Sequence, residues 1–292
     1  MKLSYLYQQA VKLGAQCDPR QQKNKISSYA DTAILNGNPD SRIKRVLVGI
    51  DIEVAELLLA DRIRSREGLD LVISHHPEGR AYASLYKVMQ LQVDVLKKAG
   101  IPVAVAQKFL DERMEEVSRR VMPANHTRPV DAARLLGIPF MCVHTPADNH
   151  VFYFIQQLLK KVKPRKVAGV VDMLLKIPEY KEAAGQASGP RIILGSPGRQ
   201  TGKILVEMTG GTEGPKDIFD KLYKAGIRTI VGMHLSEEHF KKVKDINLSV
   251  VIAGHISSDT LGLNLLLDRI EKQANERLEV ISCSGFKRIS RN

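Results

Sequence analysis

The sequence contains no tryptophan, and all aromatic residues together make up 5% of its 292 residues. Flat surfaces for stacking nucleic acid bases are therefore poorly provided for. No run of eighteen apolar residues occurs, which argues against a membrane-spanning helix. The first twenty residues contain neither a continuous apolar stretch nor a cleavage site, so we expect no export signal.

Cysteine is scarce as well. Cys17, Cys142 and Cys283 are odd in number and far apart in sequence, which argues against a framework of disulfide bonds. Chains without such a framework are typical of a reducing compartment, so we expect a cytoplasmic location.

Several common catalytic and nucleotide-binding motifs are missing. There is no Gly-x-Ser-x-Gly elbow and no Cys-x-x-Cys pair. Residues 210–215 (GGTEGP) precede a predicted helix, and exposed amides at a helix start can hold phosphate. The segment lacks the Lys-Ser or Lys-Thr ending of a P-loop, so a plain turn is the simpler interpretation.

Negative charge is the other deficit. Lysine and arginine exceed aspartate and glutamate by 44 to 32, which gives a formal net charge of +12. A surplus of this size attracts the phosphate groups of nucleotides or nucleic acids. Its densest run, KKVKPRK at residues 160–166, has five basic residues in seven. Such a run is also typical of a solvated surface, so it does not by itself establish a nucleic-acid partner.

Aliphatic runs alternate with amphipathic segments along the chain. In the first part the pattern predicts strands at 45–50, 70–74 and 139–144, and helices at 53–65, 81–98, 108–121, 129–137 and 149–162. In the second part it predicts strands at 203–208, 228–233, 248–254 and 278–284, and helices at 215–226, 236–245 and 258–273. This alternation indicates an α/β fold with largely parallel sheets.

Proline and glycine interrupt residues 163–202 so often that we expect a linker or excursion there. The chain is then divided into a first α/β half at 1–162, with a helical insertion near 108–137, and a second α/β half at 203–292. Residues 69–76 (LDLVISHH) resemble 248–255 (LSVVIAGH), a faint internal repeat. The repeat places two histidines at equivalent strand ends, where open α/β sheets bind ligands.

Histidine is the most informative residue type, since only eight occur. Three predicted strands end in histidine: one in His75 and His76, one in His144 and one in His255. Asp148 and Asp259 follow the last two by four residues, a spacing that puts both side chains on one side of a helical turn. Imidazole and carboxylate are the usual ligands of zinc, iron and manganese.

Two adjacent histidines diverge in an extended chain, so they suit two neighbouring ions better than one. A mixed set of nitrogen and oxygen ligands predicts a pair of divalent ions about 3.5–4 Å apart. The predicted metal ligands are His75, His76, Asp148, His255 and Asp259. Histidines at strand ends also serve as ordinary hydrogen-bonding residues, so spacing alone leaves both interpretations open.

Three segments in this order, SHHP (74–77), HTPAD (144–148) and GHISSD (254–259), resemble the signature segments of the NGG-one-interacting-factor-three-like family. Its members are often labelled GTP cyclohydrolase type-two-like. Residues 46–56 and 236–255 are similar to other parts of that family. The resemblance implies two divalent metals in a cleft between two similar α/β halves, held by the five residues above, and a ring-shaped homohexamer.

The sequence departs from the family in two places. The final ligand position is usually glutamate in the family, whereas this chain has Asp259, whose side chain is one methylene shorter. This puts in doubt whether the carboxylate bridges both metals. The stretch between His76 and Asp148 is longer than the family pattern, with the extra residues expected in the helices near 108–137.

Other polar residues carry weaker predictions. His144 is expected to orient Asp148 rather than to bind metal. Asp51 and His234 occupy equivalent strand ends and are candidates to support the site or the substrate, although a turn acid and a surface histidine explain them equally well. His126 has no partner in the sequence, and we assign it no role.

These observations favour a dinuclear metal-dependent hydrolase in which a metal-bound hydroxide attacks a nucleotide or another phosphorylated small molecule. The alternative is a metal-containing binding or regulatory protein with a protein or nucleic-acid partner and no turnover. A scaffold in which the five residues only form hydrogen bonds is the third interpretation. The sequence does not identify catalytic residues beyond the ligands.

Overall fold

Two largely parallel β-sheets organise the chain, and the computed structural model describes all residues 1–292. The first sheet has the order β1-β4-β3-β2-β9, with bounds Thr32–Asn36, Phe140–Val143, Leu71–Ser74, Arg45–Gly49 and Glu279–Ser282. The second has the order β5-β8-β7-β6, with bounds Arg191–Leu194, Ser249–Ile252, Ile227–Gly232 and Lys203–Glu207. Only the edge strands β1 and β5 run antiparallel to their neighbours.

Twelve α-helices cover the sheets. Their bounds are α1 Leu3–Cys17, α2 Val54–Glu67, α3 Gly79–Ala83, α4 Gln92–Ala99, α5 Val103–Val121, α6 Arg128–Leu136, α7 Thr145–Val162, α8 Val167–Leu174, α9 Pro178–Gly185, α10 Phe219–Lys224, α11 Glu237–Val243 and α12 His255–Ala274. None of them combines the length and the apolar character needed to cross a bilayer. The predicted α/β class with two halves is confirmed.

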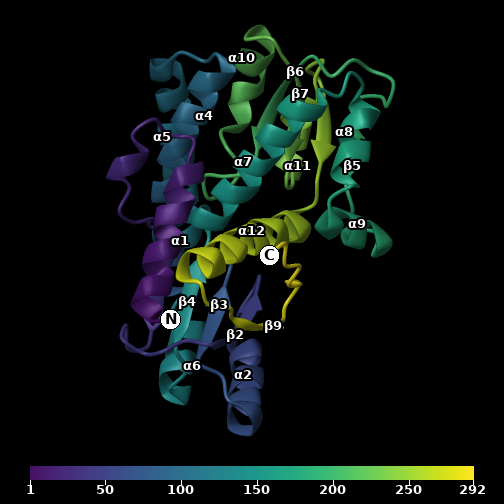
Figure 1. Cartoon of the computed structure of the whole chain (residues 1–292). Coiled ribbons are helices and arrows are strands. Elements are labelled where there is room, and N and C mark those ends of the chain that lie inside the picture. Colours follow the sequence, from purple (N-terminus) through teal and green to yellow (C-terminus); the bar gives the residue numbers. More distant parts are fainter.

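The first sheet lies in the lower part of Figure 1 and the second in the upper part, with α7 and α12 between them. Because side chains alternate along a strand, each sheet has two apolar faces. On the first sheet, Val46 and Val48 face α1 and α12, whereas Leu47 faces α2 and α6. Helix α7 begins in the core of the first sheet at Ala147 and ends on the second sheet with Ile155 and Leu159.

Two segments pack outside the half that the sequence division gives them. Strand β9, placed with the second half, pairs in parallel with β2 of the first sheet. Helices α4 and α5, placed with the first half, form a core with strands of the second sheet through residues such as Leu96, Leu110 and Ile230. The chain therefore crosses between the two sheets more often than its repeat suggests.

The residues expected to form a linker, 163–202, are structured. They form α8, α9 and edge strand β5, which pairs with β8. Val167, Val170 and Tyr180 from these helices are fully buried against the second sheet. The prolines and glycines that suggested a linker mark the short turns between these elements, and Pro178 begins α9.

Candidate metal centre

The predicted ligands lie at the carboxyl ends of three strands, at the boundary between the two sheets. His75 and His76 directly follow β3, and Asp148 lies in the first turn of α7, which follows β4. His255 is the first residue of α12, and Asp259 lies one turn further on. Gly254 permits the sharp turn from β8 into α12, since its φ of 110° is accessible to glycine.

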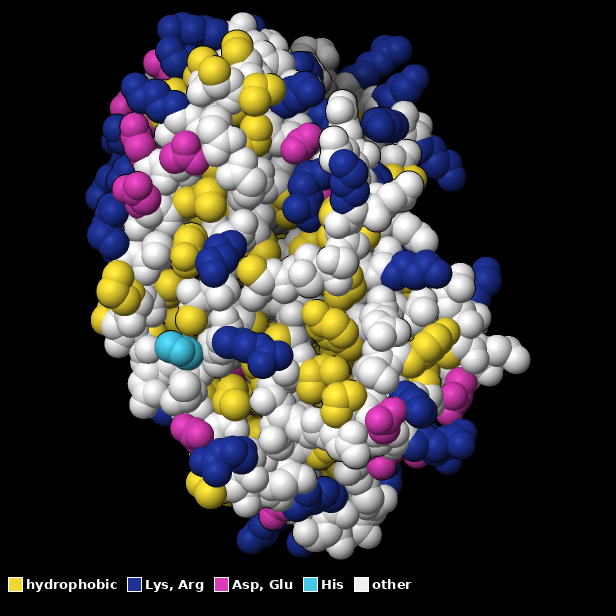
Figure 2. Space-filling view, turned by 90° about the vertical axis from the view of Figure 1, so that its left-hand side faces the viewer, with side chains coloured by type: hydrophobic (Ala, Val, Ile, Leu, Met, Phe, Trp, Pro, Cys, Tyr) yellow, Lys and Arg dark blue, Asp and Glu magenta, His cyan; other side chains and the backbone are white.

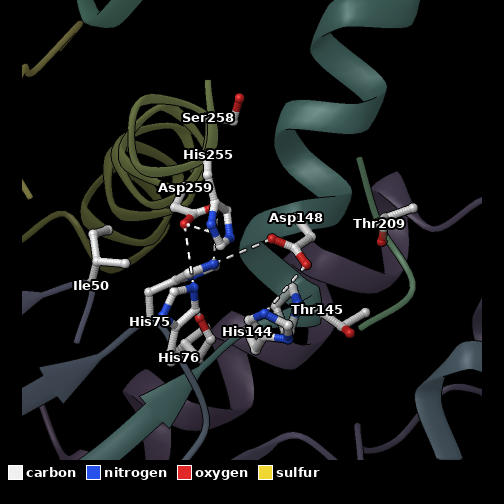
Figure 3. Close-up of polar contacts among 12 residues, drawn as sticks. Ile50, His75, His76, His144, Thr145, Asp148, Thr209, His255, Ser258 and Asp259 are labelled. Carbon is white, nitrogen blue, oxygen red and sulfur yellow. Dashed lines mark hydrogen bonds and ion pairs between the residues drawn. The ribbon is translucent and has the colours of Figure 1, made fainter. Parts of the chain in front are cut away.

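The structure brings all five side chains together in two overlapping groups (Figure 3). In the first group, His75 Nε2 lies 3.4 Å from Asp148 Oδ1 and 3.5 Å from Asp259 Oδ1. In the second group, the Nε2 atoms of His76 and His255 both lie 3.5 Å from Asp259 Oδ2. Asp259 thus offers one carboxylate oxygen to each group.

Four of these ligand atoms are buried and have no hydrogen-bond partner: His75 Nε2, Asp148 Oδ1 and both carboxylate oxygens of Asp259. Burying an acceptor without a partner is costly, and burying an unpaired carboxylate is more so. Divalent cations would satisfy all four atoms at once. The residues present therefore fit a metal site, and buried His and Asp side chains of this kind are able to hold a metal ion.

Hydrogen bonds at Nδ1 hold the rings of His75 and His76 in place. His75 Nδ1 donates to the Val143 carbonyl oxygen at 3.1 Å, so its Nε2 keeps a lone pair for the site. His76 Nδ1 is 2.6 Å from Asp51 Oδ1, which gives Asp51 the supporting position predicted for it. Such partners of ligating histidines orient the ring and increase its basicity.

A buried carboxylate that the sequence analysis missed holds the third histidine. Asp31 accepts hydrogen bonds from His144 Nδ1 at 2.8 Å and from the Thr145 hydroxyl at 2.6 Å. His144 Nε2 then faces Asp148 Oδ2 at 3.8 Å, in agreement with an orienting role. His144 also lies close enough to His75 and His76 to form a third group of possible metal ligands with them.

The site carries an excess of negative charge. Burial lowers the pKa of His75, but Asp259 and Asp148 outweigh it and raise that pKa to about 10. Burial likewise lowers the pKa of His76, which the neighbouring carboxylates of Asp259 and Asp51 raise to about 9. Burial raises the pKa of Asp259, yet His75 and His76 hold it far below its ordinary range. Without a cation, the carboxylates draw protons onto these two rings.

A cavity of about 460 Å³ opens onto His76, His144 and His255. Part of its wall is formed by Asn125 and His126, which lie between α5 and α6, and by Arg128, the first residue of α6. His126 therefore lines the cavity, although its sequence context gave it no role. The other walls carry Asp51, Glu53, Glu78, Tyr82, Thr212 and His234, among others.

His234 stands beside this cavity as well as beside the ligands. Its ring centroid is 4.7 Å from that of His255, and its Nδ1 is 3.4 Å from Glu213 Oε1. Glu213 comes from the glycine-rich segment 210–215, which also lines the cavity at Gly211 and Thr212. His234 thus has a carboxylate behind it and the cavity in front, as a residue that contacts substrate would.

No protein-family model matches this sequence, and no curated protein matches it. Among solved structures, a NIF3 superfamily protein from Sphaerobacter thermophilus is similar over 95% of this chain and 97% of its own, with 27% identity and a TM-score of 0.77. Two more distant structures share the fold. HcgD from Methanocaldococcus jannaschii has 15% identity and a TM-score of 0.52, covering 87% of this chain and 90% of its own.

The second, TTHA1606 from Thermus thermophilus, has 15% identity and a TM-score of 0.50 over 97% of both chains. At this identity the two distant structures speak for the fold alone. The similarity to the Sphaerobacter protein extends over nearly the whole chain, and the three ordered motifs converge in one site. The fold and the convergence of these motifs support a relationship of this chain to the NIF3 superfamily.

Proposed function

We propose that the protein is a divalent-metal-dependent hydrolase that acts on a nucleotide or another phosphorylated substrate. The observation that carries the proposal is the set of four buried ligand atoms without partners, which face one another beside an open cavity. Buried polar atoms in a purely structural site are paired in most cases, so four unpaired atoms facing one another point to a ligand.

Two groups of residues would hold the cations. His75 and Asp148 would bind one ion and His76 and His255 the other, with Asp259 shared between them. Divalent cations at such a site stabilise negative charge that develops on the substrate and make water a stronger nucleophile at neutral pH. His144 would orient Asp148, and Asp51 would hold the His76 ring in place.

The cavity supports a substrate with two chemically different ends. Its floor is the cation site, which attracts an anionic group such as a phosphate. Its wall carries the carboxyl groups of Glu53 and Glu78 and the amide of Asn125, each with an oxygen that accepts hydrogen bonds. These groups accept hydrogen bonds from N–H donors, which nucleobases provide. The net charge of +12 would increase the encounter rate with anionic substrates.

The test combines metal quantification with a substrate screen. The purified protein is analysed for zinc, iron and manganese, and then assayed against nucleotides and phosphoesters with and without a chelator. We expect turnover that the chelator abolishes and that the His76→Ala/His255→Ala variant lacks. Activity that persists in either condition would contradict the proposal. Bound metal without turnover of any substrate would favour a binding or regulatory protein instead.

The cytoplasmic location and the ring-shaped homohexamer also belong to this proposal. All three cysteines are free in the structure, and two of them are buried, as suits a reducing compartment. The hexamer rests on the family resemblance and is checked by light scattering of the purified protein. A monomeric mass would remove that part of the proposal without affecting the metal site.

A further inference from the structure

A cavity of about 480 Å³ lies apart from the metal centre, between the end of α7 and strand β6. It shares no lining residue with the cavity at the metal ligands. Three of its lining residues are cationic, Lys160, Lys163 and Arg165, and none is acidic. It therefore presents only positive charge to a ligand.

The side chains of the three cationic residues are free to bind a ligand. All are exposed, and none forms an ion pair or a side-chain hydrogen bond within the protein. Lys160 lies in the last turn of α7, where its positive charge also interacts favourably with the negative end of the helix dipole. Lys163 and Arg165 lie beyond the helix, so the dipole does not account for them. Gln156, Gln200 and Thr201 line the same cavity with polar side chains.

Positive charge continues from this cavity toward the N-terminal part of the fold. Lys160 and Lys23 are close enough to Lys98 to lower its pKa, in addition to the effect of burial. Figure 2 views the molecule from the side of α1, α4 and α5, and shows Lys and Arg side chains spread over this face with fewer Asp and Glu among them.

We propose that Lys160, Lys163 and Arg165 bind successive phosphates of a nucleic acid backbone. The cavity that carries these cations also carries amide and hydroxyl groups, which are typical of phosphate contacts. The absence of tryptophan and the few aromatic residues fit recognition of the backbone rather than of stacked bases. A duplex suits this chemistry, since its phosphates are exposed while its bases are enclosed.

Fluorescence anisotropy with a labelled 20-base-pair DNA duplex tests the proposal between 50 and 200 mM NaCl. We expect the Lys160→Glu/Lys163→Glu/Arg165→Glu variant to bind at least about tenfold more weakly at 100 mM salt. The slope of log affinity against log salt should become shallower by about 2–3, because each lost phosphate contact contributes about 0.9. The corresponding triple glutamine variant should also give a shallower slope, with a smaller loss of affinity than the glutamate variant.

The control changes net charge equally at the other end of the molecule. Arg62 and Arg66 are exposed on α2, and Arg277 is exposed just before β9. The Arg62→Glu/Arg66→Glu/Arg277→Glu variant should keep the wild-type slope and most of the affinity. Equal weakening of both charge-reversal variants would overturn the proposal. So would a wild-type protein that fails to bind the duplex at 50 mM salt, or one that binds only acidic peptides or free nucleotides.

Discussion

Asp259 reaches both ligand groups because its two carboxylate oxygens point to different histidines. Oδ1 is 3.5 Å from His75 Nε2, whereas Oδ2 is 3.5 Å from both His76 Nε2 and His255 Nε2. The family pattern has the longer glutamate at this position. In this fold α12 begins at His255 and brings the backbone of Asp259 close enough for the shorter side chain to serve both groups. The two carboxylate oxygens of Asp259 therefore lie near both groups without the additional methylene.

Substitutions at Asp259 and His255 should affect metal content differently. We expect wild-type protein to hold about two ions per chain, and Asp259→Ala to hold fewer than one, because Asp259 belongs to both groups. His255→Ala should keep about one ion, since His255 contacts only one group. Elemental analysis after dialysis measures both. Equal metal content in the two variants would show that the carboxylate is not shared.

Asp31 has a supporting role that depends on its complete burial. It accepts hydrogen bonds from His144 and Thr145, and its side chain is inaccessible to solvent. Asp31→Asn should lower metal affinity by roughly 10–100-fold and stability by about 1–3 kcal/mol. Competition with a fluorescent chelator and urea unfolding measure the two effects. Asp40→Asn, at an exposed surface ion pair, is the control and should change neither.

Helix α7 carries Asp148 and is held between two glycines at its first turn. A Cβ atom on Gly14 of α1 would lie 2.6 Å from Pro146, and one on Gly262 of α12 would lie 2.5 Å from the Ala147 carbonyl oxygen. Real Cβ atoms do not approach so closely. The glycines therefore let α1 and α12 pack tightly on α7, which sets the distance between Asp148 and Asp259.

Gly262→Ala should force α12 away from α7. We expect a loss of about 1–3 kcal/mol in the free energy of unfolding, together with weaker metal binding, because the two carboxylates separate. Gly185→Ala in α9 is a matched control, since nothing lies within 4 Å of its added methyl group. The control should be neutral or slightly stabilising. Normal metal affinity in Gly262→Ala would show that the helix crossing does not position the site.

Glu213 joins the glycine-rich segment to α11 and gives a pH-dependent contribution to stability. Burial raises the pKa of Glu213, but a hydrogen bond to His234 and the nearby His239 outweigh burial and lower the pKa to about 2. A lowered folded-state pKa stabilises the protein above the unfolded value near 4.3 and loses this effect as pH falls toward 2.

The Glu213→Gln variant isolates this effect. Wild type should be more stable than the variant by about 2–3 kcal/mol at pH 6, and the difference should shrink between pH 4.5 and 3. Urea unfolding at several pH values measures it. A difference that stays constant over this range would contradict the assignment.

The elements found from sequence were those with a strong local pattern. Strands β2, β3, β7 and β8 were predicted because each is a short run of buried β-branched residues. The pairing of β9 with β2 has no local signal, since more than two hundred residues separate them. Helix α1 was missed although Leu3, Leu6, Ala10 and Leu13 recur at helical spacing and are buried.

The site was partly predictable for the same reason. Histidine is rare in this chain, and three predicted strands end in it, so the five side chains that converge in the structure could be named without coordinates. Asp31 could not, because it is a single aspartate before an edge strand and reaches His144 only in the folded sheet. Likewise, the cavity residues between α5 and α6 are recognised only once both helices are placed.

At the scale of the whole molecule, the candidate metal site joins elements of both sheets. Its ligands follow β3 and β4 of the first sheet and β8 of the second. Bound metal should therefore stabilise the entire fold, by about 2.7 kcal/mol when free metal is at 100 times the dissociation constant. Thermal unfolding with and without chelator measures this stabilisation.

The His76→Ala/His255→Ala variant is the reference for that measurement. It lacks ligands of one group, so added metal should raise its melting temperature by less than that of the wild type. If metal raises both melting temperatures equally, the cations bind elsewhere on the protein.

The pairing of β9 with β2 also limits the order in which the parts of the molecule can fold during synthesis. On the ribosome, β2 emerges more than two hundred residues ahead of the strand that covers its open edge. Helix α12, with two of the ligands, arrives just before that strand. One edge of the nascent first sheet therefore stays unpaired until all four strands of the second sheet have been synthesised. In a cell that overproduces this protein, we expect chaperones to bind the growing chain during that interval.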